Sequence, residues 1–216
     1  MGSVSLFEND FEEATRFFPK LKYRKIEKGK IWVVSGELDV CDKVGDYWGT
    51  FVIAIYLSDS YPYCVPLVKE VSKVIKRDDD WHIDEDGYCC LDIEHKMLLL
   101  KKRGMNLTDF IKNKVYPYFA NQIYKENEGK YAAGEYLHNF EGVQQFYREE
   151  LNIGSVELAI NILQGIIFRK LPERNELCFC GERKFKACHL NSVEFLRSMP
   201  VDRLKTDLDE FAKLVV

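Results

Sequence analysis

Apolar residues near the start of the chain recur at intervals of four, three and four, which is the spacing of one face of an α-helix. These residues are Phe7, Phe11, Ala14 and Phe18. Ser5, followed three residues later by Glu8, has the spacing of a capping box. The pattern therefore predicts an N-terminal helix that begins just after Ser5.

The segments that follow have the composition of β-strands. Residues 48–57 (WGTFVIAIYL) are apolar on both faces, as expected of a central strand, and residues 31–40 are rich in β-branched side chains. Two more strands are predicted at residues 21–26 and 67–74. Because these segments are close in sequence and separated by glycine-containing turns, we expect an antiparallel meander.

The second half of the chain is predicted to be helical. Residues 78–87 are polar and without periodicity, which indicates a surface loop. An apolar stripe from about residue 106 predicts a helix that Pro117 kinks or restarts, and a further helix is expected at residues 140–151. The order of elements predicts the α+β class, with a helix first, a four-stranded antiparallel sheet next and helices last.

A domain boundary is predicted at residues 152–155, where the helical pattern pauses at Asn, Ile, Gly and Ser. Residues 1–152 would form the α+β domain. Residues 153–216 would form a small helical tail, because apolar residues in it again step by three and four. Residues 171–190 interrupt that periodicity and contain three of the cysteines.

Composition narrows the class of protein. Of 216 residues, 46% are hydrophobic and 31% charged, a globular balance that excludes a wholly disordered chain. Lys and Arg number 31 and Asp and Glu 35, so the net charge of −4 disfavours nucleic acid as the main partner. No apolar run reaches the roughly 18 residues of a membrane span, and the N-terminus lacks a signal peptide. We therefore expect a cytoplasmic protein without membrane partners.

The seven cysteines are not spaced as a disulfide framework. Their number is odd, and three of them, Cys178, Cys180 and Cys188, gather beside His189. Together with the missing secretion signal, this favours reduced thiols and one metal-binding cluster.

Two segments resemble the ubiquitin-conjugating enzymes. Residues 61–68 (YPYCVPLV) resemble that family's YPxxPPxV segment, with Val65 at a position where the family has a proline. Residues 87–93 (GYCCLDI) resemble its GxxCLDI segment and place Cys90 at the catalytic cysteine. The interval between the segments also fits, so the resemblance extends over roughly residues 5–150. It implies the fold of that family for the first domain.

The chain departs from the eukaryotic pattern just before the cysteine. The His-Pro-Asn triplet of that family falls on Asp80, Trp81 and His82, so that a histidine replaces the asparagine. Divergent bacterial members look similar, and some belong to antiviral operons. The resemblance implies a transferase that holds a ubiquitin-like protein, or a C-terminally conjugated nucleotidyltransferase, as a thioester. It also implies acceptor lysines and a separate activating enzyme that consumes ATP.

The residue types around Cys90 suit such chemistry. A thiol that ends a polar loop can be exposed, and His82 could donate to the oxyanion or accept a proton from the attacking amine. Acidic neighbours, Asp92 among them, should raise the pKa of the thiol. That favours a carrier that attacks an activated thioester over a protease, and Asp92 could orient the acceptor.

Other readings stay open. Cys89 should face the opposite side of an extended segment and pack in the core. His95 and His138 are further candidates, each with a structural role as the simpler interpretation. The alternative function is a catalytically inactive binding module or adaptor for a ubiquitin-like protein or a nucleotidyltransferase.

Residues 178–189 resemble the SEC-C zinc motif, a short module found at protein tails. Cys178, Cys180, Cys188 and His189 supply three thiolates and one imidazole, the ligands of a closed tetrahedral zinc site. The segment between Cys180 and Cys188 is one residue shorter than in the usual motif. A structural zinc ion is therefore expected, with no cofactor at Cys90.

Overall fold

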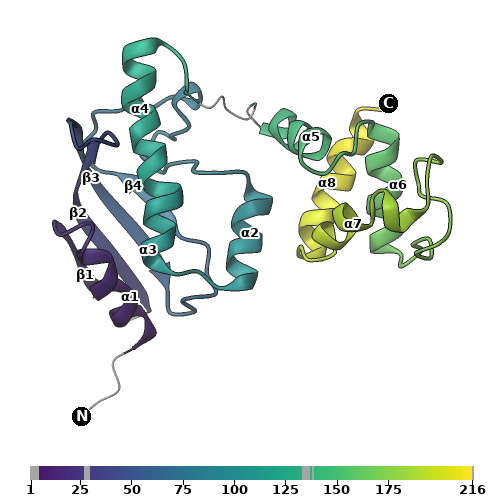
Figure 1. The fold of residues 1–216 in the computed structure, drawn as a ribbon, viewed down its shortest axis with the longest axis horizontal. Helices are drawn as coiled ribbons and strands as arrows, with labels where there is room; N and C mark the ends of the chain where they lie inside the picture. The colour runs from purple at the N-terminus through teal and green to yellow at the C-terminus, as the bar shows by residue number, and fades with distance from the viewer. Residues whose placement is uncertain (1–4, 27–29, 133–136, 138, 216) are drawn as a thin grey trace. The chain divides into compact units, whose positions relative to one another are not determined.

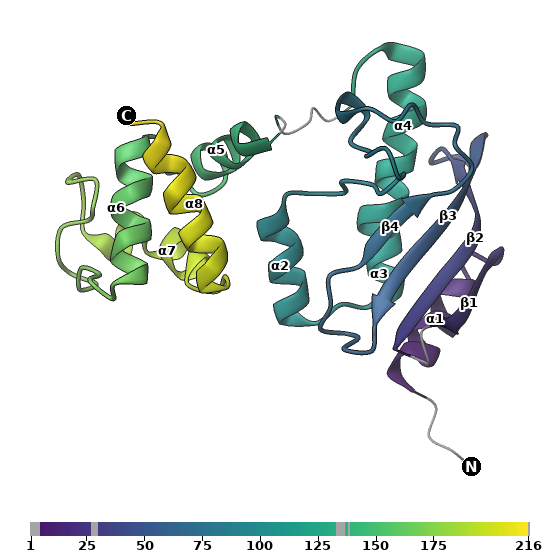
Figure 2. The same cartoon turned by 180° about the vertical axis from the view of Figure 1, so that it is seen from behind.

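The computed structural model describes residues 5–26, 30–132, 137 and 139–215. The chain divides into two units, Met1–Glu135 and Tyr136–Val216. Figure 1 and Figure 2 show a sheet with helices in the first unit and helices alone in the second. The described part of the chain thus has the predicted α+β class, with an N-terminal helix, a four-stranded antiparallel sheet and C-terminal helices.

The first unit begins with helix α1 (Leu6–Thr15), whose N-terminus has the predicted capping box: Ser5 accepts from the amide of Glu8, and the Glu8 carboxylate accepts from the amide of Ser5. Four strands follow in the sheet order β1-β2-β3-β4. They are β1 (Leu21–Ile26), β2 (Ile31–Cys41), β3 (Tyr47–Ser58) and β4 (Leu67–Glu70). All neighbouring strands pair antiparallel, which confirms the predicted meander.

Strand β4 is shorter than its apolar pattern predicts. Its ladder ends at Glu70, after which Val71 still donates to the carbonyl of Val52 and the hydroxyl of Ser72 accepts from the amide of Val52. Lys73 then adopts a positive φ of 59°, which turns the chain away from the sheet. The loop that carries the candidate cysteine therefore starts earlier than expected.

Helices cover one face of the sheet in the first unit (Figures 1 and 2). After α2 (Glu94–Arg103), a continuous helical run consists of α3 (Leu107–Phe110), a π-helical turn (Ile111–Val115) and α4 (Tyr116–Glu128). Pro117 stands at the start of α4, as the predicted restart requires, because proline has no amide hydrogen to donate. Rings join the layers: Phe7 of α1 stacks on Trp32 at 4.0 Å, and Phe119 of α4 lies 4.7 Å from Phe51.

The second unit contains α5 (Asn139–Glu149), α6 (Val156–Ile167), α7 (Leu190–Leu196) and α8 (Val201–Lys213). Helix α5 belongs to this unit, whereas the predicted boundary at residues 152–153 assigns it to the first domain. Aromatic packing explains the difference, since Phe140 and Tyr147 of α5 lie 4.9 and 5.0 Å from the ring of Phe211 in α8. The Tyr147 hydroxyl also donates to the buried carboxylate of Asp207.

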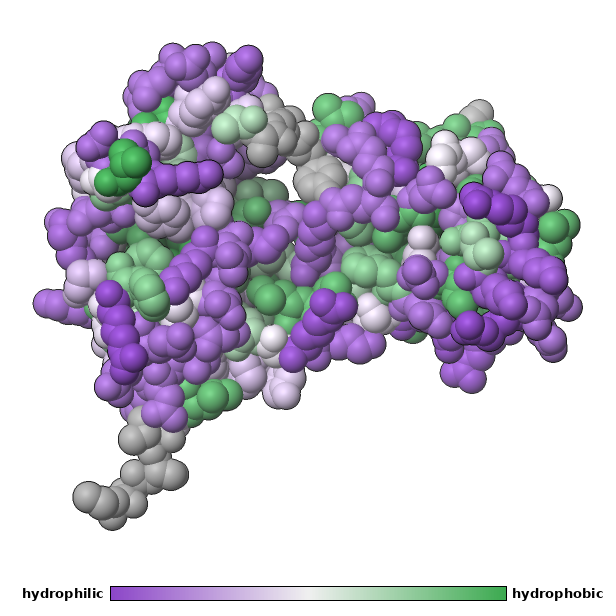
Figure 3. Space-filling view, viewed as in Figure 1, coloured by the Kyte–Doolittle hydropathy of each residue, from purple (hydrophilic) through white to green (hydrophobic). Residues whose placement is uncertain are grey.

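Hydrophilic side chains predominate on the face that Figure 3 shows. Within the described residues, every helix is too short or too polar to cross a lipid bilayer.

Candidate functional site

The loop after β4 folds back on that strand and brings the predicted residues to the sheet edge. The amide of Cys89 donates to the carbonyl of Val68 at 2.8 Å, and the amide of Glu70 donates to the carbonyl of Gly87 at 2.9 Å. Gly87 has a φ of 90°, and a Cβ there would lie 2.8 Å from the carbonyl oxygen of Glu70. Only glycine fits this close approach, so the position fixes how the loop meets β4.

The two adjacent cysteines have different surroundings. Cys90 is exposed, whereas Cys89 is half-buried and packs against the hydrophobic core. Burial raises the pKa of the Cys89 thiol to about 12, so this group stays protonated at neutral pH. Of the pair, Cys90 is therefore the thiol that a reagent or a substrate can reach.

The surroundings of Cys90 disfavour its thiolate. Partial desolvation raises the pKa of the thiol, and the negative charge of Asp92 raises it further. The sulfur also lies 4.0 Å from the carbonyl oxygen of Asp92. A thiol with a raised pKa is a stronger nucleophile once ionised, but only a small fraction is ionised at neutral pH.

The backbone segments that carry His82 and Cys90 run side by side and are joined by a hydrogen bond. The amide of Cys90 donates to the carbonyl of His82 at 2.8 Å, and Ile83 pairs with Cys89 in an antiparallel bridge. His82 itself is left-handed, with φ 49° and ψ 43°, and its ring lies 5.6 Å from the ring of Tyr131. The structure thus brings the two backbones together, and the role of the imidazole in proton transfer stays a prediction.

Asp92 is engaged with cations. Its carboxylate forms ion pairs with Lys114 and, at 4.0 Å, with Lys96, and it accepts the amide of Ile93 at 2.8 Å. Its side chain is only 10% exposed. These contacts hold the carboxylate beside the turn just after Cys90, and its contact with an acceptor lysine stays a prediction.

Of the two other candidate histidines, the structure describes only His95. His95 lies in α2 and is fully buried. His138 lies outside the described residues. Sequence reasoning also missed the polar contacts of the loop. These are made by the buried Tyr118 and Gln122 of α4 and by the ion pair between the fully buried Glu70 and the half-buried Arg77. Their spacing of four within an apolar helical stripe was the available signal for the first two.

The second candidate site is the cluster of three cysteines and one histidine. Its ligand atoms, from Cys178, Cys180, Cys188 and His189, all lie within 4.8 Å of one another. Nδ1 of His189 lies 3.3 Å from the sulfur of Cys178 and 3.2 Å from that of Cys188, and the sulfurs of Cys180 and Cys188 are 3.4 Å apart. Tetrahedral zinc ligands stand about 3.6 to 3.8 Å apart, so a small shift accommodates an ion.

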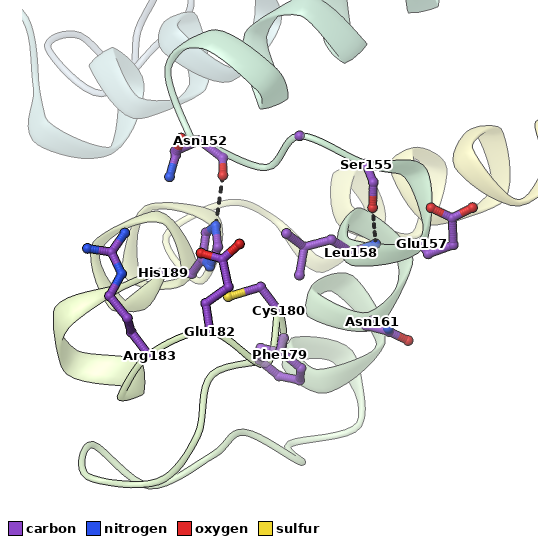
Figure 4. A pocket seen from close by; sticks show the side chains of 11 residues that line it. Asn152, Ser155, Glu157, Leu158, Asn161, Phe179, Cys180, Glu182, Arg183 and His189 are labelled. Atoms are coloured by element: carbon purple, nitrogen blue, oxygen red, sulfur yellow. Dashed lines mark hydrogen bonds between the residues drawn. The ribbon is translucent and has the colours of Figure 1, made fainter.

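The backbone around the cluster is built for this convergence. The amide of Gly181 donates to the carbonyl of Cys178, and Gly181 has a φ of 76°, which closes a tight turn between two ligands. Nε2 of His189 lies 2.7 Å from the carbonyl oxygen of Asn152 (Figure 4). That contact holds the proton on Nε2 and leaves Nδ1 for a metal, an arrangement common around bound histidines. The cluster can therefore hold a metal ion.

A pocket opens beside the cluster in the second unit (Figure 4). It is lined by Cys180 and His189, by the start of α6 around Ser155, and by Asn161 and Arg183. Its lining is polar and carries both signs of charge, since Glu182 stands beside Arg183.

Comparison of the chain with protein-family models and with curated proteins gave no match.

Proposed function

We propose that the first unit is a ubiquitin-conjugating-like transferase that carries an acyl group on Cys90. The observation that carries this proposal is the position of Cys90, an exposed thiol held at the edge of a rigid sheet by hydrogen bonds on both sides of its loop. The two family-like segments at residues 61–68 and 87–93 support it, as does the order of helix, four antiparallel strands and helices.

The chemistry is an acyl exchange followed by an acyl transfer. The ionised sulfur of Cys90 attacks the carbonyl carbon of a donor thioester, the donor carbon–sulfur bond breaks, and the departing thiolate takes up a proton. An amine, such as a lysine of the acceptor, then attacks the new thioester and releases the Cys90 thiol. The raised pKa of Cys90 fits an activated donor, because a thioester needs less help than an amide.

The resemblance to the ubiquitin-conjugating enzymes suggests a donor and how it is supplied. We propose a ubiquitin-like protein, or a nucleotidyltransferase joined through its C-terminal carboxyl group, as the acyl group in a bacterial antiviral system. A separate activating enzyme would form the first thioester, since the sequence has no glycine-rich phosphate loop. His82 would assist the transfer.

The second unit is proposed to hold a structural zinc ion in an SEC-C-like module. Three thiolates and one imidazole fill a tetrahedral site, so the ion would cross-link the segment around Cys178 to the start of α7 without an open position for catalysis. Arg183, Lys184 and Lys186 can offset the net negative charge of such a site. Metal analysis of the purified full chain should find about one zinc per chain, and its absence after purification with added zinc would contradict this proposal.

Trapping tests the transferase. The Cys90→Ser and Cys90→Lys variants should form a stable ester or amide with a short peptide thioester that ends in glycine, whereas the wild-type adduct should be cleaved by added thiol. The Cys89→Ala variant is the control and should retain the labile adduct. If Cys90→Ala retains acylation and Cys89→Ala loses it, the assignment is wrong. Binding of a ubiquitin-like protein without any adduct would instead favour the inactive binding module.

A further inference from the structure

Polar side chains on one face of the helical run α3–α4 reach the loop that carries His82 and Cys90. They are spaced by four, four and three residues, which is the periodicity of a single helical face. These residues are Lys114, Tyr118, Gln122 and Lys125. Lys114 binds the carboxylate of Asp92, and the other three donate to backbone carbonyls of the loop.

The three carbonyl groups are consecutive. Lys125 donates to the carbonyl of residue 80, and the Gln122 amide donates to that of residue 81 at 3.2 Å. The Tyr118 hydroxyl lies 3.2 Å from the carbonyl oxygen of residue 81 and 3.1 Å from that of residue 82. The turn ends in the left-handed His82, and side chains of α4 donate to its last three carbonyls.

The carbonyl of His82 links this stripe to the thiol. It accepts the Tyr118 hydroxyl on one side and the amide of Cys90, at 2.8 Å, on the other. Tyr118 is 8% exposed, and burial raises the pKa of its hydroxyl, so the group remains a donor at any working pH. The Tyr118 hydroxyl thus holds the carbonyl of His82, and that carbonyl in turn holds the backbone amide of Cys90.

We propose that Tyr118 is a positioning residue for the thioester chemistry of Cys90, acting through the carbonyl of His82. This inference builds on the proposed function. A loop that loses this anchor keeps its thiol but samples other orientations, and small displacements of a reacting group slow a reaction strongly. The residue touches neither donor nor acceptor, so its effect is on the rate of transfer and not on donor binding.

The chain offers a matched control on the same helix. Tyr116 accepts the amide and donates to the carbonyl of Cys41, both at 2.8 Å, and so also makes two backbone hydrogen bonds through its hydroxyl. Tyr118→Phe and Tyr116→Phe each remove one hydroxyl and keep the ring. Gln122→Met is a third variant and removes one donor to the carbonyl of residue 81. Tyr118 still donates to that carbonyl in this variant.

The experiment measures three quantities on the full chain with zinc present. Acyl transfer from the peptide thioester through Cys90 to added lysine gives kcat and KM. Hydrogen exchange gives the protection of the Cys90 amide, and thermal melting reports stability. Tyr118→Phe should lower kcat about tenfold at unchanged KM and speed exchange of the Cys90 amide, whereas Tyr116→Phe should leave both within about twofold. Gln122→Met should fall between them.

The proposal is overturned if Tyr118→Phe and Tyr116→Phe give the same kcat and the same exchange rate at the Cys90 amide. It is also overturned if Tyr118→Phe changes only the melting temperature. The proposed function fails separately, when the wild-type chain takes no acyl group from the thioester. In that case, hydrogen exchange together with alkylation of Cys90 by iodoacetamide still decides whether Tyr118 positions the thiol.

Discussion

Gly165 of α6 tests how closely the metal-binding loop is packed. A Cβ at this position would lie 2.6 Å from Cζ of Phe179 and 3.2 Å from the carbonyl oxygen of Lys170. Overpacking of this kind costs about 1 to 3 kcal/mol. Alanine in place of a helical glycine gains about 1 kcal/mol from its helix propensity. The two effects have opposite signs, so the outcome depends on whether Phe179 can move.

Phe179 stands between the ligands Cys178 and Cys180, and a bound metal ion would hold its backbone on both sides. In the metal-free chain the ring can shift, so Gly165→Ala should change the free energy of unfolding by less than about 1 kcal/mol. In the metal-loaded chain the full clash remains, and after the gain in helix propensity a net loss of up to about 2 kcal/mol is expected. The difference corresponds to zinc binding that is weaker by about tenfold.

Two measurements check this prediction. Competition with a chromophoric chelator gives the zinc affinity, and circular dichroism follows unfolding of the helices. The three tryptophans, at positions 32, 48 and 81, all lie in the first unit, so their fluorescence is an internal control that should not change. The exposed neighbour Gln164 provides a second control, since Gln164→Ala should leave zinc affinity unaltered.

A double variant separates the clash from other causes. Phe179→Leu shortens the side chain that meets the new methyl group, so it should recover most of the zinc affinity lost in Gly165→Ala, with a coupling of about 1 kcal/mol. The reasoning is refuted if Gly165→Ala stabilises the chain both with and without zinc and leaves the affinity unchanged. Helix propensity alone would then account for the effect of Gly165→Ala on stability.

Three further predictions concern single groups. Arg77→Met leaves the fully buried carboxylate of Glu70 without its cation and should lower the stability of the first unit by about 3 to 5 kcal/mol in urea unfolding followed by tryptophan fluorescence. A loss below about 1 kcal/mol would show that other groups satisfy that carboxylate. Asp92→Asn removes a negative charge that raises the pKa of Cys90, so the pH profile of alkylation by iodoacetamide should move to lower pH, and a shift to higher pH would contradict the assigned cause. Cys188→Ser should weaken zinc binding by more than about 100-fold, measured by chelator competition, and an unchanged affinity would remove Cys188 from the ligand set.

The first helix and the strands were predictable because each pattern had one dominant cause. The stripe that contains Phe7 and Ala14 has to be buried on one side, and the capping box marks where the helix begins. Residues 48–57 are apolar on both faces because β3 lies between β2 and β4. Local sequence therefore carried enough information to place the start of α1 and the first three strands within one or two residues, whereas β4 ends four residues earlier than predicted.

Features that depend on contacts distant in sequence were missed or assigned to the wrong unit. Helix α2 (Glu94–Arg103) has charged residues on several sides, and its burial of His95 and Met97 depends on the tertiary structure. Helix α5 has a clear amphipathic pattern, but the pattern does not indicate which of the two units its apolar face packs against. The contacts of α4 with the loop join residues about 40 positions apart, for example Tyr118 and the carbonyl of His82. Only the folded chain shows that these polar residues serve the loop.

The candidate sites divide in the same way. The metal ligands could be predicted because Cys-x-Cys and Cys-His bring ligand atoms together within a short segment. The structure adds the carbonyl of Asn152 as the hydrogen-bond partner of His189. The identity of the reachable thiol depended on strand alternation, which placed Cys89 inward. The ion pair of Asp92 with Lys114 had no sequence signal, since the two residues are 22 positions apart and Lys114 lies within a π-helical turn.

The seven cysteines, all described in the structure, are free, and their surroundings decide which of them a reagent meets first. Cys90 is the exposed one, while Cys180 and Cys188 of the cluster are half-buried. A bound metal ion would occupy the cluster sulfurs, so alkylation of the metal-loaded chain should modify Cys90 before them. After chelation the cluster thiols compete for the same reagent. A loss of selectivity for Cys90 on removal of zinc is therefore expected from chemistry alone, without communication between the units, and peptide mapping of the alkylated sites distinguishes this competition from a real change at Cys90.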